Sequence, residues 1–428
     1  RSVQWIDGLC LNYWVEGRIL LDQRHNRCSI LMTFQTFRRE ARHWLETNCP
    51  GSMRTRMVPG EEINGGRKRL GNNLEAYEWL ALMAAKGWTV PTWPVEFGGA
   101  GRSAEEFTVL LEELQRINAR PPLGGMGVSM LGPTLLEYGT EAQKQQHLPG
   151  IAKGEIAWCQ GYSEPGAGSD LASLQTRAED QGDHFLVNGS KIWTSGAQHA
   201  DWMFCLVRTD PSRPKHEGIS FLLFDMESPG VTTRPISLIN GESPFCETFF
   251  DNLRVPKSQL LGPLNQGWPI GKRLLQHERS GLSVLANGDR AGPLERILPS
   301  QPLEQLVQSY AGLSPSDPHI RNLIVRSDME KRAFLLTQKR ALQESESETP
   351  GAATSIFKVV EANYVKAQLE LQLLIRGTQG LGWEGEAFSE EERAMCRLWL
   401  EAKSISIAGG SNEIQFNIIA KRVLGLPD

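Results

Sequence analysis

Hydrophobic positions recur with a helical period at both ends of the chain and as short strand-like runs in the middle. One helix is expected to begin near Glu141 and to stop before Pro149, because proline lacks the backbone N–H that a helix interior needs. Another helix is expected over 104–114. Four apolar side chains there fall on one face, at spacings of three and four: Phe107, Leu110, Leu111 and Leu114.

The middle of the chain has a different pattern. Short apolar runs over 184–187, 202–207 and 219–224 are rich in aromatic and β-branched residues. Turn signals such as Asn188-Gly189 and Ser228-Pro229-Gly230 separate them. This alternation predicts a compact β domain, either a barrel or a sandwich.

Helical periodicity returns after Gly267 and continues almost to the end. The segment 369–375 forms one apolar stripe. The segment 343–351 alternates acidic and hydroxyl residues before a Pro-Gly pair, so we expect a solvated loop between two helices. An earlier stripe comprises Leu274, Leu275, Leu282 and Leu285.

These three blocks predict an α+β protein with several domains. We expect an N-terminal helical domain over 32–154, a central β-barrel or β-sandwich domain over 155–265, and a C-terminal helical bundle over 266–428. Residues 1–31 show no sustained period. We interpret them as a leader or upstream translated segment outside the fold, with a genuine irregular arm as the alternative.

Composition narrows the function classes. The formal charge of −5 argues against nucleic acid as the main partner, because phosphate binding needs clustered Lys and Arg. No apolar stretch reaches the roughly 18–20 residues that a membrane span needs. The seven cysteines form neither a disulfide framework nor a zinc-ligand spacing, and the histidines show no His-x-x-x-His pair. We therefore expect no metal and a location in the reducing cytoplasm.

Three segments carry the candidate chemistry. The segment 159–170, CQGYSEPGAGSD, is a turn-rich loop whose glycines and hydroxyls suit close approach to a polar ligand. Alone, such a loop would be better explained as a surface turn. It is followed by NGSKIWTSGA over 188–197 and IAGGSNEIQ over 407–415. In order and spacing, the three resemble the signatures of the acyl-CoA dehydrogenases, and the resemblance covers about 32–428.

The resemblance implies a three-domain fold that ends in a four-helix bundle, with FAD between the β domain and the C-terminal helices. It implies a dimer or tetramer whose neighbouring subunit helps to hold the adenosine end of FAD. Trp193 should cover the flavin ring, Ser195 should lie close to N5, and Ser169 should lie where cofactor and thioester meet. A simple core aromatic is the alternative for Trp193. The residues implied for FAD binding are Gln160, Tyr162, Ser163, Gly168, Ser169, Trp193, Thr194, Ser195, Ser411 and Glu413.

Desaturation of an acyl-CoA needs a base for the α proton, and members of this family commonly use a glutamate at one of two places. The first directly precedes the glycine–hydroxyl pair of the third segment, where this chain has Gly409. The second lies on the first long helix of the C-terminal domain, where Glu278 is the matching residue and our catalytic candidate. Leu274 and Leu282 lie one turn to either side, so burial should raise the pKa of this carboxyl towards the range of a general base. An ion pair with a neighbouring Arg or Lys is the structural alternative.

The resemblance also implies the substrate contacts. The backbone N–H at Gly409 and a ribityl hydroxyl of FAD should donate to the thioester carbonyl, which acidifies the α proton. Because glycine has no side chain beside the reacting carbons, our hypothesis is a roomier pocket for branched, cyclic or terminally functionalised acyl groups. Gly410 and Ser169 are further expected substrate contacts, and Arg279 is expected to orient the thioester or an adjacent carboxylate.

Two departures from the family pattern concern assembly. The element Arg-x-x-Phe-Gly has no clear counterpart between Arg290 and Arg321, and Gln-x-x-Gly-Gly is replaced around 376–380. The motif pattern is closest to the large subunit of pimeloyl-CoA dehydrogenase. We therefore expect a homo- or hetero-oligomer with a second acyl-CoA dehydrogenase-like subunit that supplies the missing pyrophosphate contacts. Electron-transferring flavoprotein is the implied acceptor, and fatty acid β-oxidation within lipid metabolism is the expected process.

One motif is set aside. The segment 380–385 satisfies G-x-G-x-x-G, but it follows a helical pattern, whereas a dinucleotide-binding turn follows a strand. The predicted function is therefore FAD-dependent α,β-desaturation of an acyl-CoA. Two alternatives stay open: a flavin oxidase or monooxygenase of the same fold, and a non-catalytic partner subunit of a heteromeric dehydrogenase.

Overall fold

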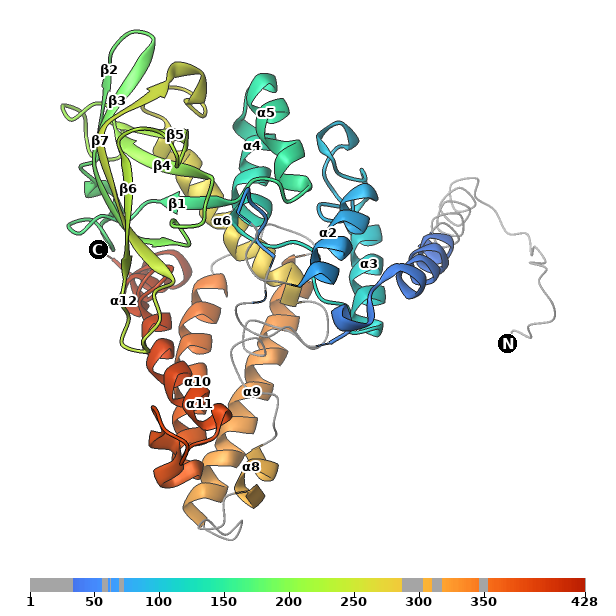
Figure 1. The fold of residues 1–428 in the computed structure, drawn as a ribbon. Coiled ribbons are helices and arrows are strands. Elements are labelled where there is room, and N and C mark those ends of the chain that lie inside the picture. Colours follow the sequence, from blue (N-terminus) through green and yellow to red (C-terminus); the bar gives the residue numbers. More distant parts are fainter. Residues whose placement is uncertain are drawn as a thin grey trace, which may run out of the picture.

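The computed structural model describes residues 34–55, 61, 63–68, 73–286, 303–309, 318–345 and 353–427. The predicted leader over 1–31 lies outside the described residues. Within them, helices are followed by strands and then by helices again, which confirms the predicted order of three blocks (Figure 1). No helix of this described part is both long and apolar enough to cross a membrane.

The N-terminal block consists of helices joined by short turns. Capping boxes begin two of them: the Ser103 hydroxyl accepts from the N–H of Glu106, and that of Thr140 from the N–H of Gln143. The elements are a helix over 34–48, η1 (Gly51–Met53), α2 (Leu74–Ala85), η2 (Val95–Phe97), α3 (Ala104–Arg116), η3 (Gly127–Leu131), α4 (Gly132–Tyr138) and α5 (Glu141–Ala152).

The predicted end of the second helix was wrong. Helix α5 begins at Glu141 as expected, but it continues through Pro149 to Ala152. Leu148 and Ile151, on either side of the proline, are 0% and 1% exposed in the core shared with the β domain. Their burial outweighs the one backbone hydrogen bond that proline removes.

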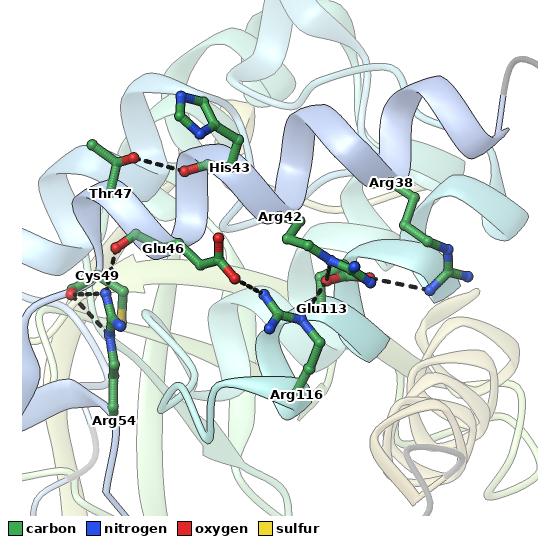
Figure 2. A network of polar contacts seen from close by, with 9 residues as sticks. All are labelled: Arg38, Arg42, His43, Glu46, Thr47, Cys49, Arg54, Glu113 and Arg116. Carbon is green, nitrogen blue, oxygen red and sulfur yellow. Dashed lines mark hydrogen bonds and ion pairs between the residues drawn. The ribbon is translucent and has the colours of Figure 1, made fainter.

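Helix α3 carries a carboxylate inside the N-terminal block. The Glu113 side chain is 1% exposed and lies among the guanidinium groups of Arg38, Arg42 and Arg116 (Figure 2). The Arg42 group binds both carboxylate oxygens, each at 2.9 Å, and Arg116 Nε donates at 2.8 Å. This network joins the helix over 34–48 to α3.

The central block is one seven-stranded sheet, which confirms the predicted β domain. Its order is β1-β4-β2-β3-β7-β6, with β5 also paired to β4. Side chains of β3 and β7 share one core with those of β4 and β5, so the sheet curls onto itself. The strands are β1 (Trp158–Gly161), β2 (Arg177–Asp180), β3 (His184–Ser195), β4 (Trp202–Arg208), β5 (Ile219–Asp225), β6 (Val231–Ile236) and β7 (Phe245–Pro256).

The C-terminal block is helical, with α10 packed against α8, α9, α11 and α12. The predicted loop over 343–351 begins too early, because α9 continues to Ser345. The elements are α6 (Gly267–Ala286), α8 (Leu303–Ser309), α9 (Pro318–Ser345), α10 (Ala353–Arg376), η6 (Gly377–Leu381), α11 (Glu390–Glu401), η7 (Ala402–Ser406), α12 (Asn412–Ile418) and η8 (Ile419–Val423).

Helix α6 joins the parts of the molecule (Figure 1). Its residues Ile270 and Leu274 are 2% and 0% exposed, in one core with Leu135 of α4 and Phe204 and Phe221 of the sheet. The N-terminal block, the sheet and α6 therefore bury a common surface, and the predicted catalytic helix is fixed at its first half.

Candidate functional site

The loop after β1 contains the first group of predicted site residues. Gln160 lies in β1, and Tyr162 is buried with its hydroxyl 3.5 Å from a backbone carbonyl oxygen of α6. Ser163 is partly buried, whereas Gly168 and Ser169 are exposed. No atom lies within 4 Å of the place where a Cβ would stand on Gly168. The base of the loop is therefore packed, and its tip is open.

A buried ion pair holds this loop against β3. Lys191 is 0% exposed, and its Nζ lies 2.7 Å from Oε1 of Glu164 and 3.1 Å from the carbonyl oxygen of Tyr162. The Glu164 carboxylate also accepts from the N–H groups of Gln175 and Thr176, at 2.6 and 2.9 Å. Burial alone would raise the pKa of Glu164, but Lys191 and the N–H donors together lower it. The charged pair thus fixes both ends of the loop.

Arg208, at the end of β4, holds the second half of the same loop. Its guanidinium donates to the carbonyl oxygens of Ala172 at 2.6 Å, Lys215 at 2.8 Å and Leu174 at 3.3 Å. Burial lowers the pKa of Arg208 from its ordinary value, yet three carbonyl acceptors suit a cation with several donors. The backbone beneath the open tip is therefore bound to the sheet.

Trp193 lies at a strained point near the end of β3. The register with β7 shifts between Lys191 and Thr194, and Trp193 has φ +60°. The left-handed region is unfavourable for a bulky residue, and such strain clusters at functional sites. The side chain is 53% exposed, and its ring meets that of Phe245 edge-on at 6.0 Å. A half-exposed ring does not fit the alternative of a core aromatic.

Buried polar side-chain atoms without a hydrogen-bond partner lie in β1 and near the end of β3. Within the described part of the chain, the Thr194 hydroxyl and Nε2 of Gln160 accept or donate no hydrogen bond. Ser195, partly buried, is in register with Phe245 of β7. An unpaired buried polar atom costs about 1–3 kcal/mol, so each of these two atoms would gain from a hydrogen bond to a polar ligand. They fit the expected FAD, whose flavin ring carries both donors and acceptors.

The third predicted segment forms a glycine turn before α12. Gly409 and Gly410 have φ +66° and +98°, and the Ser411 hydroxyl caps α12. Glu413 is exposed in the first turn, where its own backbone N–H and the Ser411 hydroxyl lower the pKa of its carboxyl. The nearest atom to the place of a Gly409 Cβ is Cε of Lys358, at 3.9 Å.

Helix α10 holds this turn. Lys358 Nζ donates to the carbonyl oxygen of Ile405, and Nδ2 of Asn412 donates to Oδ1 of Asn363 at 3.2 Å. The described contacts thus bind the third segment to α10. The first two segments are joined to each other, since the N–H of Ile192 donates to the carbonyl of Ser163 at 2.9 Å.

Glu278 and Arg279 occupy adjacent positions in α6, one turn after the fully buried Leu274. Their side chains lie outside the described residues, so both roles stay predictions. The backbone of the helix before them is well fixed, because it shares the core of the sheet.

One turn before Glu278, α6 is tied to α4. The Glu137 carboxylate accepts from Arg273 at 2.7 and 2.8 Å and lies 3.0 Å from Nε2 of His277. Arg273 lowers the pKa of Glu137, and burial lowers the pKa of His277. This contact fixes the rotation of α6 directly before the predicted base.

Sequence reasoning missed Glu164, Lys191 and Arg208 as residues that hold the site. A partial signal existed for Lys191, because apolar Phe185 and Val187 alternate and the same count places position 191 inside. The count holds only because β3 runs through Asn188-Gly189, where a turn was predicted, and that prediction was wrong. A lysine at an inward position needs a partner. No comparable signal marks Arg208, whose acceptors are backbone carbonyls of a loop.

Three family models match consecutive parts of the chain. The acyl-CoA dehydrogenase N-terminal domain matches residues 35–155, the middle domain 159–253 and the C-terminal domain 265–424. Together they cover most of the described residues and confirm the predicted family.

Curated relatives and solved structures agree. Acyl-CoA dehydrogenase IpdE1 of Mycolicibacterium smegmatis is 36% identical over 411 residues, which cover 93% of this chain and 99% of that protein. IpdE1 of Mycobacterium tuberculosis is 36% identical over 397 residues, 92% and 98% of the two chains. A structure titled Tcur3481-Tcur3483 steroid ACAD is 32% identical with a TM-score of 0.71, covering 92% and 98%. The ChsE4-ChsE5 complex of Mycobacterium tuberculosis is 29% identical with a TM-score of 0.69, covering 92% and 98%.

Proposed function

The chain belongs to the acyl-CoA dehydrogenase family and is an FAD-dependent oxidoreductase, and from this premise we propose that it desaturates an acyl-CoA with a bulky, ring-bearing acyl group. The observation that carries the choice of substrate is Gly409. The family's commonest pattern has a carboxylate there, and this chain has open space, with only Lys358 Cε at 3.9 Å from a Cβ position.

FAD is the cofactor, and we assign its contacts to the loop after β1, the end of β3 and the turn before α12. When bound, FAD supplies the acceptor for the hydrogen that leaves the β carbon. The unpaired Gln160 Nε2 and Thr194 hydroxyl would hydrogen-bond the cofactor, and Trp193 would exclude water from one face of the ring. The remaining assigned contacts are Tyr162, Ser163, Gly168, Ser169, Ser195, Ser411 and Glu413.

The proton chemistry is assigned to Glu278. Its carboxylate would remove the α proton, while the N–H of Gly409 donates to the thioester carbonyl and stabilises the charge that develops there. The fixed first half of α6 supports this, because a base must be held within hydrogen-bond reach of its proton. Arg279, Ser169 and Gly410 are assigned to the substrate.

The backbone of Gly409 bears on the size of the acyl group. Its φ of +66° favours glycine for backbone reasons, since another residue there costs about 1 kcal/mol. That cost is small enough for a carboxylate to be retained if the reaction needed one. Its loss beside the reacting carbons therefore favours room for substituents, and a structural neighbour titled steroid ACAD supports ring systems. The process would then be steroid or other lipid catabolism rather than only fatty acid β-oxidation.

We further propose a hetero-oligomer with a second acyl-CoA dehydrogenase-like subunit and transfer of electrons to electron-transferring flavoprotein. One face of α9 supports a partner, because Val325, Met329 and Leu336 are 50%, 64% and 68% exposed at spacings of four and seven. Two structural neighbours carry names of paired subunits. The five described cysteines are free thiols, which supports a reducing compartment such as the cytoplasm.

The test is anaerobic mixing of the purified protein with a panel of acyl-CoAs while flavin absorbance is followed. Ring-bearing thioesters should bleach the flavin faster than straight chains of equal carbon number. The Glu278→Gln variant should retain FAD and lose bleaching, because the amide cannot accept the proton.

Other outcomes of the bleaching test would contradict parts of the proposed function. Faster bleaching by straight chains would contradict the bulky substrate, and bleaching by Glu278→Gln would contradict the base. A yellow protein that no thioester bleaches would favour an oxidase or monooxygenase, and rapid reoxidation by oxygen would support that. A colourless protein would favour a partner subunit without its own turnover.

A further inference from the structure

The turn between β6 and β7, residues 237–244, joins the two halves of the cofactor site. On one side it is attached to the end of β3: the N–H of Gly196 donates to the carbonyl oxygen of Pro244 at 2.9 Å. Directly after the turn, Phe245 meets the ring of Trp193 at 6.0 Å. The position of this turn and that of Trp193 are therefore linked.

On its other side the turn is bound by α11. Nη1 of Arg397 donates to the carbonyl oxygen of Asn240 at 2.8 Å, which crosses from the C-terminal helices to the β domain. The guanidinium lies over the ring of Trp383, with 4.1 Å between its carbon and the ring centroid. Nη2 also approaches the carbonyl oxygen of Trp383 at 3.4 Å. A planar cation stacked on an indole is well oriented to donate to a third group.

The contact has no spare room. Gly241 has φ +85°, and a Cβ on it would stand 2.8 Å from Nη1 of Arg397 and 3.5 Å from Cζ2 of Trp383. Asn240 is 1% exposed. The turn therefore admits the guanidinium closely, and an alanine at position 241 would both press on Nη1 of Arg397 and strain the backbone of the turn.

This contact also accounts for the segment 380–385, whose glycine spacing matches a nucleotide motif without a strand before it. Gly382 is closely packed, since a Cβ there would stand 2.6 Å from the ring of Phe388. The segment presents Trp383 to Arg397. Gly382 thus allows the close packing beside Trp383 on which the cation lies.

We propose that Arg397 is a positioning residue that sets the β-domain half of the FAD site against the C-terminal half, and so determines how tightly FAD is retained. The first half carries Gln160, Thr194 and Trp193, and the second carries the turn before α12. Arg397 is assigned no contact with the cofactor. The inference rests on the placement of FAD between these halves in the proposed function.

The test compares two arginines of the same helix. Arg397→Met keeps the apolar stem and removes the donor that crosses to Asn240. Arg393→Met is the matched control, because Arg393 donates only within the C-terminal part, to the carbonyl oxygens of Gly385 at 2.9 Å and Phe388 at 2.5 Å among its described contacts. The dissociation constant of FAD is measured from flavin fluorescence after dilution of the loaded proteins.

Arg397→Met should weaken FAD binding about tenfold, because a charged hydrogen bond and a cation–π contact are lost. Arg393→Met should change it less than about twofold. Gly241→Ala should also weaken FAD binding with every charge intact, and Arg397→Lys should restore part of the affinity. Far-UV circular dichroism shows whether each variant is folded.

The proposal is overturned if Arg397→Met and Gly241→Ala bind FAD as the wild type does, or if Arg393→Met weakens binding equally. Should Arg397→Met fail to fold, Gly241→Ala and Arg397→Lys carry the same comparison. The readout is independent of turnover. A wild type that holds FAD and is bleached by no acyl-CoA would contradict the proposed function and leave this test in force.

Discussion

Two carboxylates, Glu113 in the N-terminal helices and Glu164 in the β domain, are buried with lowered pKa values, but their surroundings differ. Glu113 lies among three guanidinium groups whose side chains are 29–46% exposed (Figure 2). Glu164 has one ammonium partner, Lys191, which is 0% exposed, and two backbone N–H donors. The first network joins two helices, and the second joins a loop to a strand of the candidate site.

Because of this difference, Glu113 should contribute to stability only, whereas Glu164 and Lys191 should also maintain the geometry of the site. If Glu113 loses its charge, its arginines can turn to water. The core around α3 is separate from that of the β domain, so the site should not be disturbed. If Lys191 or Glu164 loses its partner, a charge is left inside the sheet and the loop after β1 is released. Loss of the Glu113 charge should therefore lower only the stability of the fold. Loss of the Lys191–Glu164 pair should lower both stability and FAD affinity.

The largest effect is expected from Lys191→Met. Removing one member of a buried pair costs about 3–5 kcal/mol, because Glu164 is left without its cation. The unfolding free energy should fall by that amount, and FAD should be lost on dilution. Urea unfolding and flavin fluorescence measure the two quantities.

The matched control is the double variant Lys191→Met with Glu164→Gln. It removes the unpaired charge, so it should recover part of the stability without restoring tight FAD binding. Recovery of both would mean that the pair contributes no site geometry, and the comparison would fail.

Glu113→Gln should have a smaller effect and leave the site intact. Burial alone would raise the pKa of Glu113, but the hydrogen bonds and charges of Arg42, Arg116 and Arg38 lower it to about 2. Because the arginines are partly hydrated, we expect a loss of about 2 kcal/mol, less than the pKa alone would give. FAD affinity and bleaching rates should equal those of the wild type. A variant that loses FAD would contradict the separation of the two regions.

The site in the β domain could be predicted from the sequence further than the network around Glu113. The helix–strand–helix order follows from periodicity, and the site segments follow from three motifs. The alternation of β3 places Lys191 inward only once the strand is known to run through the predicted turn at Asn188-Gly189. The two arginines that clamp Glu113 from the first helix lie 71 and 75 residues away along the chain, so no local pattern shows them.

The helix through Pro149 and the shift of register near Trp193 were also beyond prediction. Both arise from packing between segments far apart in sequence: α5 against the sheet core, and β3 against β7. Local propensity favours the opposite result at each position, since proline ends helices and a bulky residue avoids positive φ. Both conformations are determined by burial against distant segments, which no short stretch of sequence reveals.

The stabilisation by Glu113 depends on pH. Since the folded pKa of Glu113 is about 2 and its ordinary value is 4.5, its contribution is present above pH 4.5 and is lost as the pH falls through about 2. The difference in unfolding free energy between wild type and Glu113→Gln should be constant from about pH 7 to 5 and should shrink towards zero near pH 2. A difference that persists at pH 2 would show that the amide disturbs packing rather than charge.

The smallest effect is expected at the exposed edge of the same network. Glu46 lies 2.5 Å from Nη2 of Arg116, and the two side chains are 47% and 37% exposed (Figure 2). Exposed ion pairs contribute at most about 1 kcal/mol, so Glu46→Gln should change the unfolding free energy by less than about 1 kcal/mol at pH 7. Added salt should abolish even that change, because exposed pairs are screened. If Glu46→Gln lowered the unfolding free energy as much as Glu113→Gln, burial of the carboxylate would not determine its contribution to stability. The contrast between Glu113 and Glu164 would then need another cause.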